Sequence, residues 1–425
     1  MRSLGQGIAA GALALLLLVC LEPAALDAQQ TSTLDETIEA GEAEAEEPAR
    51  RLVSWNHFDG KFFSIRLGGG LLVEYGAYSQ DETSQAQIAL SSAVKIRDAR
   101  LSLKGRLKFE RSVTWSCGLM YYGPTDEFLV RETGIMIEVP EIFGHIFVGR
   151  TKEGFSLNKV MVGYAGWTME RATMSDATIP ILADGVKWLG YAPELNLLWN
   201  LGFYGDWLSE GQSFSTYERQ VAGRLAWLPI RSETTGALLH VGSSFRRGKA
   251  NEGELQLHSR PESFTAPYFL DTGTFPAESA TTLGLEAYYR PGPLLLGSEY
   301  FFHDVNAPEK GDPFFHGGDV VATWLVTGET RAYNTRGGFF NSVSPRRPVF
   351  QGGPGAWELV ARFSYIDLDN ADVRGGKFWR FTPMVNWHLS DNLRLELAYG
   401  YGSLDRFELA GGKTHFFQTR LQMLL

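Results

Sequence analysis

Hydrophobic and polar side chains alternate every second residue along several segments of the chain. In residues 99–109 the odd positions are apolar or small, whereas the even positions are arginine, serine or lysine. The alternation returns in residues 357–365 and 393–401, and more weakly in 220–227 and 418–425. A period of two predicts β-strands with one apolar and one polar face. Because helical periodicity is scarce after residue 50, we predict an all-β fold.

Alternation by itself fits two kinds of β protein. In a soluble sandwich the apolar face packs on a second sheet, whereas in a transmembrane barrel it faces lipid. Aromatic residues such as Trp188 and Trp199 fall near predicted strand ends, as in the girdles of a barrel. Connectors also differ in length, from the short 389–392 to the long, polar or glycine-rich 246–279 and 303–318. These features favour a transmembrane antiparallel β-barrel with long extracellular loops.

The first fifty residues differ from the rest of the chain. Residues 1–28 begin with Arg2, continue with an apolar run of about fourteen residues and end among small residues, which is typical of a signal peptide. This run is shorter than the roughly 20 residues that a membrane-spanning helix needs. Residues 29–50 are rich in alanine and glutamate, and we predict a disordered periplasmic tail. The barrel is then predicted over residues 51–425, in the outer membrane of a Gram-negative (diderm) bacterium.

Charge and cysteine content narrow the functional classes. The chain of 425 residues has 39 basic and 49 acidic residues, and a net charge of -10 argues against nucleic-acid binding. One base and nine acids precede Ala49, which leaves 38 basic and 40 acidic residues in the body of the protein. Removal of the signal peptide leaves Cys117 as the only thiol, so an internal disulfide is not expected.

No motif in the sequence indicates catalysis or a cofactor. The eight histidines are scattered, and neither a nucleophile elbow nor a phosphate-binding loop is present. We therefore expect no enzyme activity, no cofactor and no metal site. The densest polar cluster could suggest a metal site, but its surroundings are typical of a solvated loop, which is our prediction; it comprises His303, Asp304, Glu309, Asp312, His316 and Asp319.

Basic residues gather on the polar face of the segment 95–108. On a solvated strand this would be an ordinary charged face, but in a barrel it points into the lumen, where cations attract anions. A second basic group accompanies the stretch 153–180, which we expect to fold inward and constrict the pore. The candidate pore-lining residues are Arg97, Arg100, Lys104, Arg106, Lys108, Arg150, Lys152, Lys159, Arg171 and Arg224.

Several motifs in order along the chain resemble the phosphate-selective porin O and P family. They are IRDARL at 96–101, VGRTKEGFSL at 148–157, WLVTGETR at 324–331, GAWELVARFSY at 355–365 and VNWHL at 385–389. The resemblance implies a sixteen-stranded antiparallel barrel in the outer-membrane lipid, usually a homotrimer. It also implies passive conduction of inorganic phosphate or other small anions through a lumen lined by arginine and lysine. Arg97, Arg100, Arg150, Lys152 and Arg171 lie in or near the matching motifs.

Two departures from the family pattern concern assembly and the solute. The chain ends in Leu425, where outer-membrane barrels usually end in an aromatic residue recognised during assembly, so we expect assembly to rely on the apolar Leu425 instead. The expected constriction carries Glu153 and Glu170 beside its bases, which argues against strict phosphate selectivity. A general or differently selective porin of the same fold is therefore an alternative. A more remote alternative is a secreted soluble β protein that binds glycans through exposed tryptophan and tyrosine.

Overall fold

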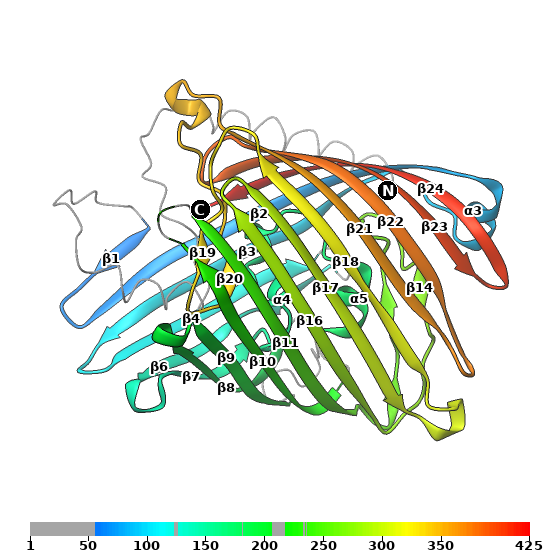
Figure 1. Cartoon of the computed structure of the whole chain (residues 1–425), viewed down its shortest axis with the longest axis horizontal. Helices are drawn as coiled ribbons and strands as arrows, with labels where there is room; N and C mark the ends of the chain where they lie inside the picture. The colour runs from blue at the N-terminus through cyan, green and yellow to red at the C-terminus, as the bar shows by residue number, and fades with distance from the viewer. Residues whose placement is uncertain (1–55, 123–125, 181, 206–216, 233, 235) are drawn as a thin grey trace.

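The protein forms one antiparallel sheet that closes on itself (Figure 1). The computed structural model describes residues 56–122, 126–180, 182–205, 217–232, 234 and 236–425. The predicted signal peptide and acidic tail lie outside the described residues. The sixteen strands of the barrel are β2 (Phe63–Gln80), β3 (Ala93–Lys108), β4 (Ser112–Tyr122), β6 (Thr133–Val139), β7 (Gly144–Thr151), β8 (Ala183–Ala192), β9 (Leu197–Gly205), β10 (Tyr217–Arg231), β11 (Ala237–Ala250), β16 (Ser279–Pro291), β17 (Leu294–Asn306), β18 (Phe314–Leu325), β21 (Ala356–Asn370), β22 (Val373–His388), β23 (Leu393–Arg406) and β24 (Leu409–Leu424).

Closure joins the first barrel strand to the last. Residues 70–80 of β2 pair with residues 414–424 of β24, while the other edge of β2 pairs with β3. The N–H of Leu425 donates to the carbonyl oxygen of Gly69 at 3.0 Å, which continues this seam. Two short strands extend the sheet locally, since β1 (His57–Asp59) pairs with β2 and β5 (Glu127–Val130) pairs with β4. The predicted sixteen-stranded antiparallel barrel is thereby confirmed.

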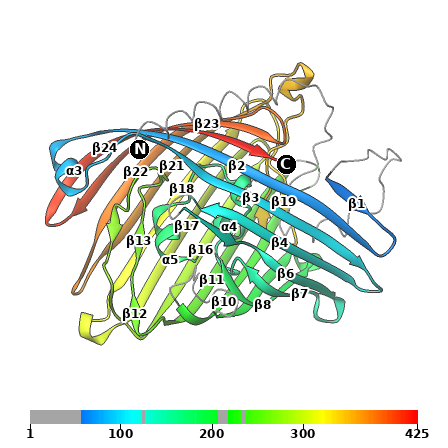
Figure 2. The same cartoon turned by 180° about the vertical axis from the view of Figure 1, so that it is seen from behind.

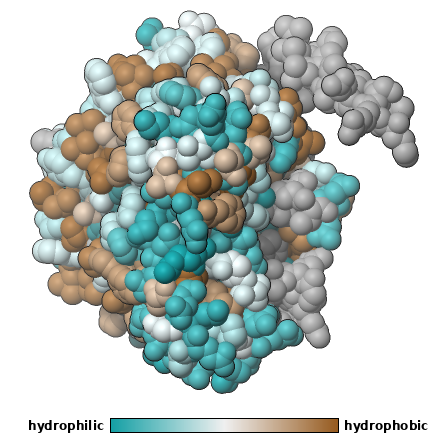
Figure 3. Space-filling model, turned by 90° about the vertical axis from the view of Figure 1, so that its right-hand side faces the viewer, coloured by the Kyte–Doolittle hydropathy of each residue, from teal (hydrophilic) through white to brown (hydrophobic). Residues whose placement is uncertain are grey.

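The two faces of the strands differ as the alternation predicts. On β3, Leu101 and Leu103 point outward with 55% and 43% of their surface exposed, whereas Asp98 points inward and is buried. Seen from the end that carries the longer loops (Figure 3), hydrophobic residues gather toward the margins and hydrophilic residues cover much of the middle. In the described part of the chain, no helix is long and apolar enough to cross a membrane. Because apolar side chains such as Leu101 and Leu103 point outward, the outer wall of the barrel is the surface that meets lipid.

The connections at the two ends of the barrel differ in length. Short turns such as 109–111, 292–293 and 389–392 lie at one end, which corresponds to the periplasmic side of an outer-membrane barrel. The opposite end carries the long connections 81–92, 152–182 and 251–278 as well as the two-residue turns 371–372 and 407–408, whereas the connection 326–355 lies at the same end as the short turns (Figures 1 and 2). Short helices shape several connections, namely α3 (Glu82–Gln87), η2 (Pro140–Ile142), η4 (Pro193–Leu195) and η5 (Pro308–Lys310).

Three long connections enter the lumen, as Figure 2 shows for the first two. The constriction loop (residues 152–182) contains α4 (Leu157–Val160), η3 (Gly163–Ala165) and α5 (Thr173–Thr178). The second inner loop (residues 251–278) contains β12 (Glu254–Leu255), β13 (His258–Ser259), β14 (Leu270–Asp271) and β15 (Phe275–Pro276). The inner turn (residues 326–355) contains β19 (Tyr333–Asn334), β20 (Phe339–Phe340) and η6 (Val349–Gln351), and it enters from the periplasmic side. Trp167, Phe269 and Phe340, one from each segment, are fully buried.

The expectation of a long solvated loop at residues 303–318 is wrong. β17 continues to Asn306 and β18 begins at Phe314, so only seven residues, 307–313, connect them. His303 faces inward, is fully buried and shares a hydrogen bond with the Thr282 hydroxyl at 2.9 Å. A polar side chain at this position agrees with the polar lumen face of a barrel strand. Within the described ranges, no group of three or more histidine, cysteine or acidic residues is arranged to hold a metal ion.

The assignment of faces predicts opposite effects of the same substitution at neighbouring positions. Leu101→Arg places a cation in lipid and is expected to reduce the free energy of unfolding by about 2–4 kcal/mol. Ser102→Arg places it in the lumen, where Ser102 is partly exposed, and is expected to fold normally. Denaturant unfolding of the refolded proteins and heat-modifiable electrophoretic migration measure the difference. Equal destabilisation by both variants would contradict the assignment.

Candidate functional site

Side chains of the barrel wall bind the main chain of the constriction loop. Six carbonyl oxygens of the loop between Tyr164 and Glu170 accept hydrogen bonds from donors on β21, β22, β23, β24 and the inner turn. Arg331 donates to Ala165 at 2.7 Å, Arg394 to Gly166 at 2.7 Å, Asn386 to Trp167 at 2.9 Å, Arg420 to Met169, Arg362 to Glu170 at 2.8 Å and Gln422 to Tyr164 at 3.2 Å. A buried segment without regular secondary structure needs such partners, because its carbonyl groups would otherwise be unsatisfied.

The arginines that hold the loop are also paired with buried carboxylates. Arg331 contacts Glu358 at 2.7 Å, and the guanidinium of Arg420 contacts Glu74 on β2. Arg362 and Arg394 are paired in the same way with Glu262 of the second inner loop and Glu396 of β23. The charge of each of these arginines is therefore largely compensated within the protein.

Glu170 connects the constriction loop to both sides of the barrel seam. Its Oε1 lies 2.6 Å from Nε of Arg97 on β3, and it also contacts Arg420 on β24. Burial alone would raise the pKa of Glu170, but the two guanidinium groups lower it to about 2. The carboxylate therefore stays charged, and the link is lost only as the pH falls toward 2.

The bases within the constriction loop donate to main-chain carbonyl oxygens. Lys152 donates to Val160 and Met161 at 3.2 and 2.7 Å, and Lys159 donates to Ile179 at 2.7 Å. Arg171 donates to Asn158 at 3.0 Å and to Met161 at 3.3 Å. Burial lowers the pKa of Lys159 to about 7, with a smaller contribution from nearby Arg171, and burial lowers the pKa of Arg171 to about 10. Through these hydrogen bonds, the cationic side chains of the loop stabilise the fold of its own main chain.

The lumen face of β3 is less covered than the lumen faces of the later strands. Its exposed or half-buried bases form the β3 strip, which comprises Lys95, Arg97, Arg100, Lys104 and Arg106. The side chains of Arg97 and Arg100 are 25% and 17% exposed, whereas those of Arg362, Arg380, Arg394 and Arg420 on β21 to β24 are at most 5% exposed. Asp98 lies on the same strand and is paired with Arg100.

Small residues of β2 lie opposite the β3 strip, and Tyr164 of the constriction loop packs against one of them. Gly70 lies opposite Arg100, Gly68 opposite Ser102, and Ser64 opposite Arg106, while Arg66 adds a further base opposite Lys104. A Cβ atom on Gly70 would lie 2.5 Å from the hydroxyl oxygen of Tyr164, so a side chain there would collide with the constriction loop. The accessible part of the lumen is thus bordered by β2, β3 and Tyr164, whose ring lies under the Arg100 guanidinium at 4.4 Å.

The remaining predicted site residues lie in different surroundings. Arg150 is buried, with Nε 2.7 Å from Asp184, and Arg224 is buried, with its guanidinium 2.7 Å from Glu286. Lys108 lies at the periplasmic end of β3 and contacts Asp59 at 2.7 Å. Arg97, Arg100, Lys104, Arg106 and Lys108 thus follow one another along β3, whereas Arg150 and Arg224 lie on β7 and β10. Whether any of the ten contacts a solute stays a prediction.

The sequence reasoning missed the loop-holding arginines of the later strands. Arg362, Arg394 and Arg420 occupy polar positions of segments whose alternation was recognised, so the signal for an inward direction was present. Their partners were not visible in the sequence, because Arg420 and Glu74 are 346 positions apart. Arg331 had no such signal, since it lies in the inner turn rather than in a strand.

A closed antiparallel barrel with an apolar outer wall, a polar lumen and a loop folded into it defines an outer-membrane porin. The profile of the phosphate-selective porin O and P family matches residues 65–424. The chain therefore belongs to this family, and it is a porin of the Gram-negative outer membrane.

Individual relatives are more distant. An uncharacterised protein of Caulobacter vibrioides is 27% identical over 270 residues, which cover 60% of this chain and 53% of that protein. Porin O of Pseudomonas aeruginosa is 27% identical over 152 residues, which cover 33% of this chain and 34% of Porin O. The chain thus spans about half and about a third of these two relatives.

Solved porins share the fold at low sequence identity. OmpT of Vibrio cholerae has a TM-score of 0.54 at 12% identity, with 87% of this chain and 99% of that chain covered. An anion-selective porin from Comamonas acidovorans has a TM-score of 0.53 at 14% identity, with 85% of this chain and 100% of that chain covered. At these identities the likeness establishes the barrel fold alone.

Removing the charge of Glu170 is expected to loosen the constriction loop. Glu170→Gln leaves Arg97 and Arg420 without a shared carboxylate, which removes the ion pairs that join the loop to β3 and to β24. We expect a higher single-channel conductance and faster proteolysis within the loop. Glu141→Gln is the matched control, because Glu141 forms an exposed pair with Arg111 at 2.5 Å. Unchanged conductance in Glu170→Gln would show that this link does not hold the loop.

Titration of Lys159 is expected to make ion preference depend on pH. Its charge is lost as the pH rises through about 7, so anion preference should fall between about pH 6 and pH 8.5. Since burial lowers this pKa below the ordinary value of a lysine, the stability contributed by the loop should rise with pH above 7. Reversal potentials across planar bilayers in a salt gradient measure the preference. In Lys159→Met the change with pH should be much smaller, and an equal change would exclude Lys159 as its source.

Proposed function

We propose that the chain is a passive porin that prefers anions, with inorganic phosphate or a related phosphorylated anion as its solute. The observation that carries this proposal is the β3 strip, where bases lie along the accessible lumen while the inward arginines of the later strands are covered by loops. Basic side chains that line a narrow pore attract anions and raise the barrier to cations. Arginine also donates to a phosphate in bidentate geometry, which favours phosphate over chloride.

The acids nearest to the β3 strip support this preference by their pairing. Asp98 already accepts from Arg100, and Glu170 already accepts from Arg97. Each pair leaves little net negative charge facing the passage, whereas Lys95, Lys104 and Arg106 add positive charge along it. The bases of the constriction loop, Lys152, Lys159 and Arg171, add further positive potential nearby.

The printed descriptions of the relatives agree with this proposal. One relative is named Porin O, and one protein of the same fold is described as an anion-selective porin. OmpT of Vibrio cholerae, with the same fold, is described in a trimer form. We propose by extension that this chain is a channel rather than an enzyme. We also propose that it forms a homotrimer embedded in outer-membrane lipid.

One observation favours a weakly selective porin as the second candidate. Glu286, Glu299 and Asp319 are direct neighbours across β16, β17 and β18 and all point into the lumen. Arg224 compensates only the first of them directly. An acidic row of this kind would reduce the preference for anions if the passage lay beside it rather than beside the β3 strip.

Conductance in planar bilayers separates the two candidates. The wild-type protein should give reversal potentials of an anion-preferring pore, and added phosphate should block chloride current. The double variant Lys104→Gln, Arg106→Gln should lower the ratio of anion to cation permeability about threefold, because two charges leave the passage wall. Arg111→Gln is the control, since Arg111 lies in an exposed turn. Cation preference in the wild type, or an unchanged ratio in the double variant, would refute the proposal.

A further inference from the structure

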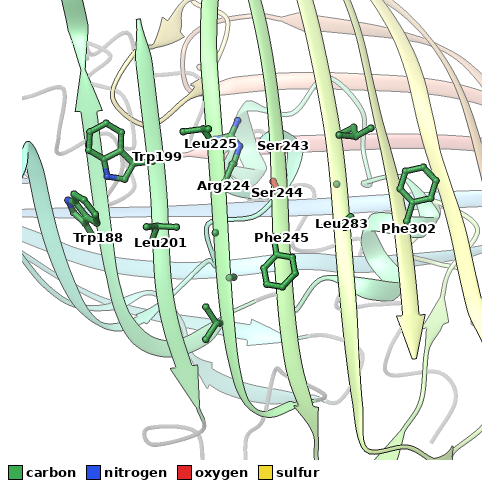
Figure 4. Close-up of a pocket in the computed structure, with 15 residues that line it drawn as sticks. Trp188, Trp199, Leu201, Arg224, Leu225, Ser243, Ser244, Phe245, Leu283 and Phe302 are labelled. Atoms are coloured by element: carbon green, nitrogen blue, oxygen red, sulfur yellow. The ribbon is translucent and has the colours of Figure 1, made fainter. Parts of the chain in front are cut away.

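The outer wall of the barrel carries a groove on the side formed by β8 to β17. The groove has a volume of about 650 Å³ and lies between apolar side chains of neighbouring strands (Figure 4). Leu201 on β9, Leu225 on β10, Phe245 on β11 and Leu283 on β16 line it, and each is 44–49% exposed. Its volume is within the range of ligand-binding clefts, of about 300–1,000 Å³.

Two small residues in the outward-facing rows create the groove. Gly223 lies between Leu201 and Phe245 in the register of β9, β10 and β11, and Ser243 lies between Leu225 and Leu285 in the register of β10, β11 and β16. A Cβ atom on Gly223 would lie 2.7 Å from Cδ2 of Leu201, so even a small side chain would begin to fill the groove. The hollow therefore depends on the absence of side-chain atoms at one point of the wall.

Basic residues occupy the next outward positions toward the extracellular end. Arg247 follows Phe245 on β11, and Arg219 precedes Val221 on β10, each one outward step of about 7 Å beyond the groove. Lys249 lies directly opposite Arg219 and contacts Glu218 at 2.5 Å. Arg219 and Arg247 are exposed, and neither forms an ion pair or hydrogen bond with residues in the ranges that the structure describes.

Other outward cations at this end of the barrel lack this arrangement. Lys377 on β22 is paired with Asp367 at 2.8 Å, and Lys413 lies on β24, away from the groove. On the far side of the basic group, the register places Thr281 and then Asp304 beside Arg247, which limits the positive surface to β10 and β11. Arg219 and Arg247 thus lie on β10 and β11, which are two of the strands that form the groove.

We propose that this surface is a binding site for a phosphate-bearing lipid of the outer leaflet. An acyl chain would lie in the groove over Gly223 and Ser243, and the phosphate of the headgroup would accept from Arg219 and Arg247. Arginine binds phosphate through two parallel N–H donors. The orientation of the site across the membrane matches a lipid in the outer leaflet, because its basic end lies toward the extracellular end of the barrel. The proposal is independent of the solute that passes through the lumen.

Lipid retention by the purified, full-length barrel tests this site. Native mass spectrometry of the delipidated protein would compare bisphosphorylated lipid A with its dephosphorylated form, which has the same acyl chains. We expect the wild type to retain the phosphorylated lipid at least tenfold better. Arg219→Gln, Arg247→Gln should abolish this difference, whereas Gly223→Leu should reduce retention of both lipids.

Matched controls and three outcomes decide the result. Lys413→Gln and Ala322→Leu change an outward cation and an outward small residue elsewhere on the wall, and both should behave like the wild type. Heat-modifiable migration should show that every variant folds. Equal retention of both lipids by the wild type, or full retention by Gly223→Leu, would overturn the proposal. A change in the number of chains per assembly in Gly223→Leu would overturn it as well, because the groove would then be covered by a second copy.

Discussion

Hydrogen bonding of the main chain is the constraint on which this structure depends. Lipid offers no partner to N–H and C=O groups, so a sheet in the membrane must close, and here β2 closes it by pairing with β24 as well as β3. The same constraint acts inside the lumen, where the constriction loop has little regular secondary structure. Its carbonyl oxygens are satisfied by arginines such as Arg331, Arg394 and Arg362. The wall therefore completes the hydrogen bonding of the loop it surrounds.

This use of arginine divides the lumen bases into two groups with different consequences. Arg362, Arg394 and Arg420 on β21, β23 and β24 are buried, bound to loop carbonyl groups and paired with glutamates, so they stabilise the arrangement of the inner segments. Bases of the β3 strip remain half-buried or exposed, with Tyr164 of the constriction loop packed beside Gly70 and under Arg100. Most buried ion pairs add little net stability compared with apolar packing, but they fix which partners meet. Here they specify where the loops lie and thereby which cations face the passage.

Small residues determine where space remains on both faces of the wall. Gly70 admits Tyr164 of the constriction loop on the lumen side, and Gly223 opens the groove on the lipid side. In both places a missing side chain matters because its neighbours are large and extend over it. The position of an accessible surface therefore follows from combinations of residues on adjacent strands, which lie far apart in the sequence.

The sequence by itself determined the direction of side chains, because alternation is a property of one strand. It was sufficient for the barrel, for the lipid-facing positions of β3, for the inward direction of Arg100, Lys104 and Arg106, and for an inward loop after β7. Only the tertiary structure decided which charges are compensated, since Arg150 meets Asp184 and Arg224 meets Glu286 across strands. It also decided that residues 326–355 enter the lumen from the periplasmic side. Pairing across a closed sheet depends on register and on distant segments, and no local pattern in the chain encodes either.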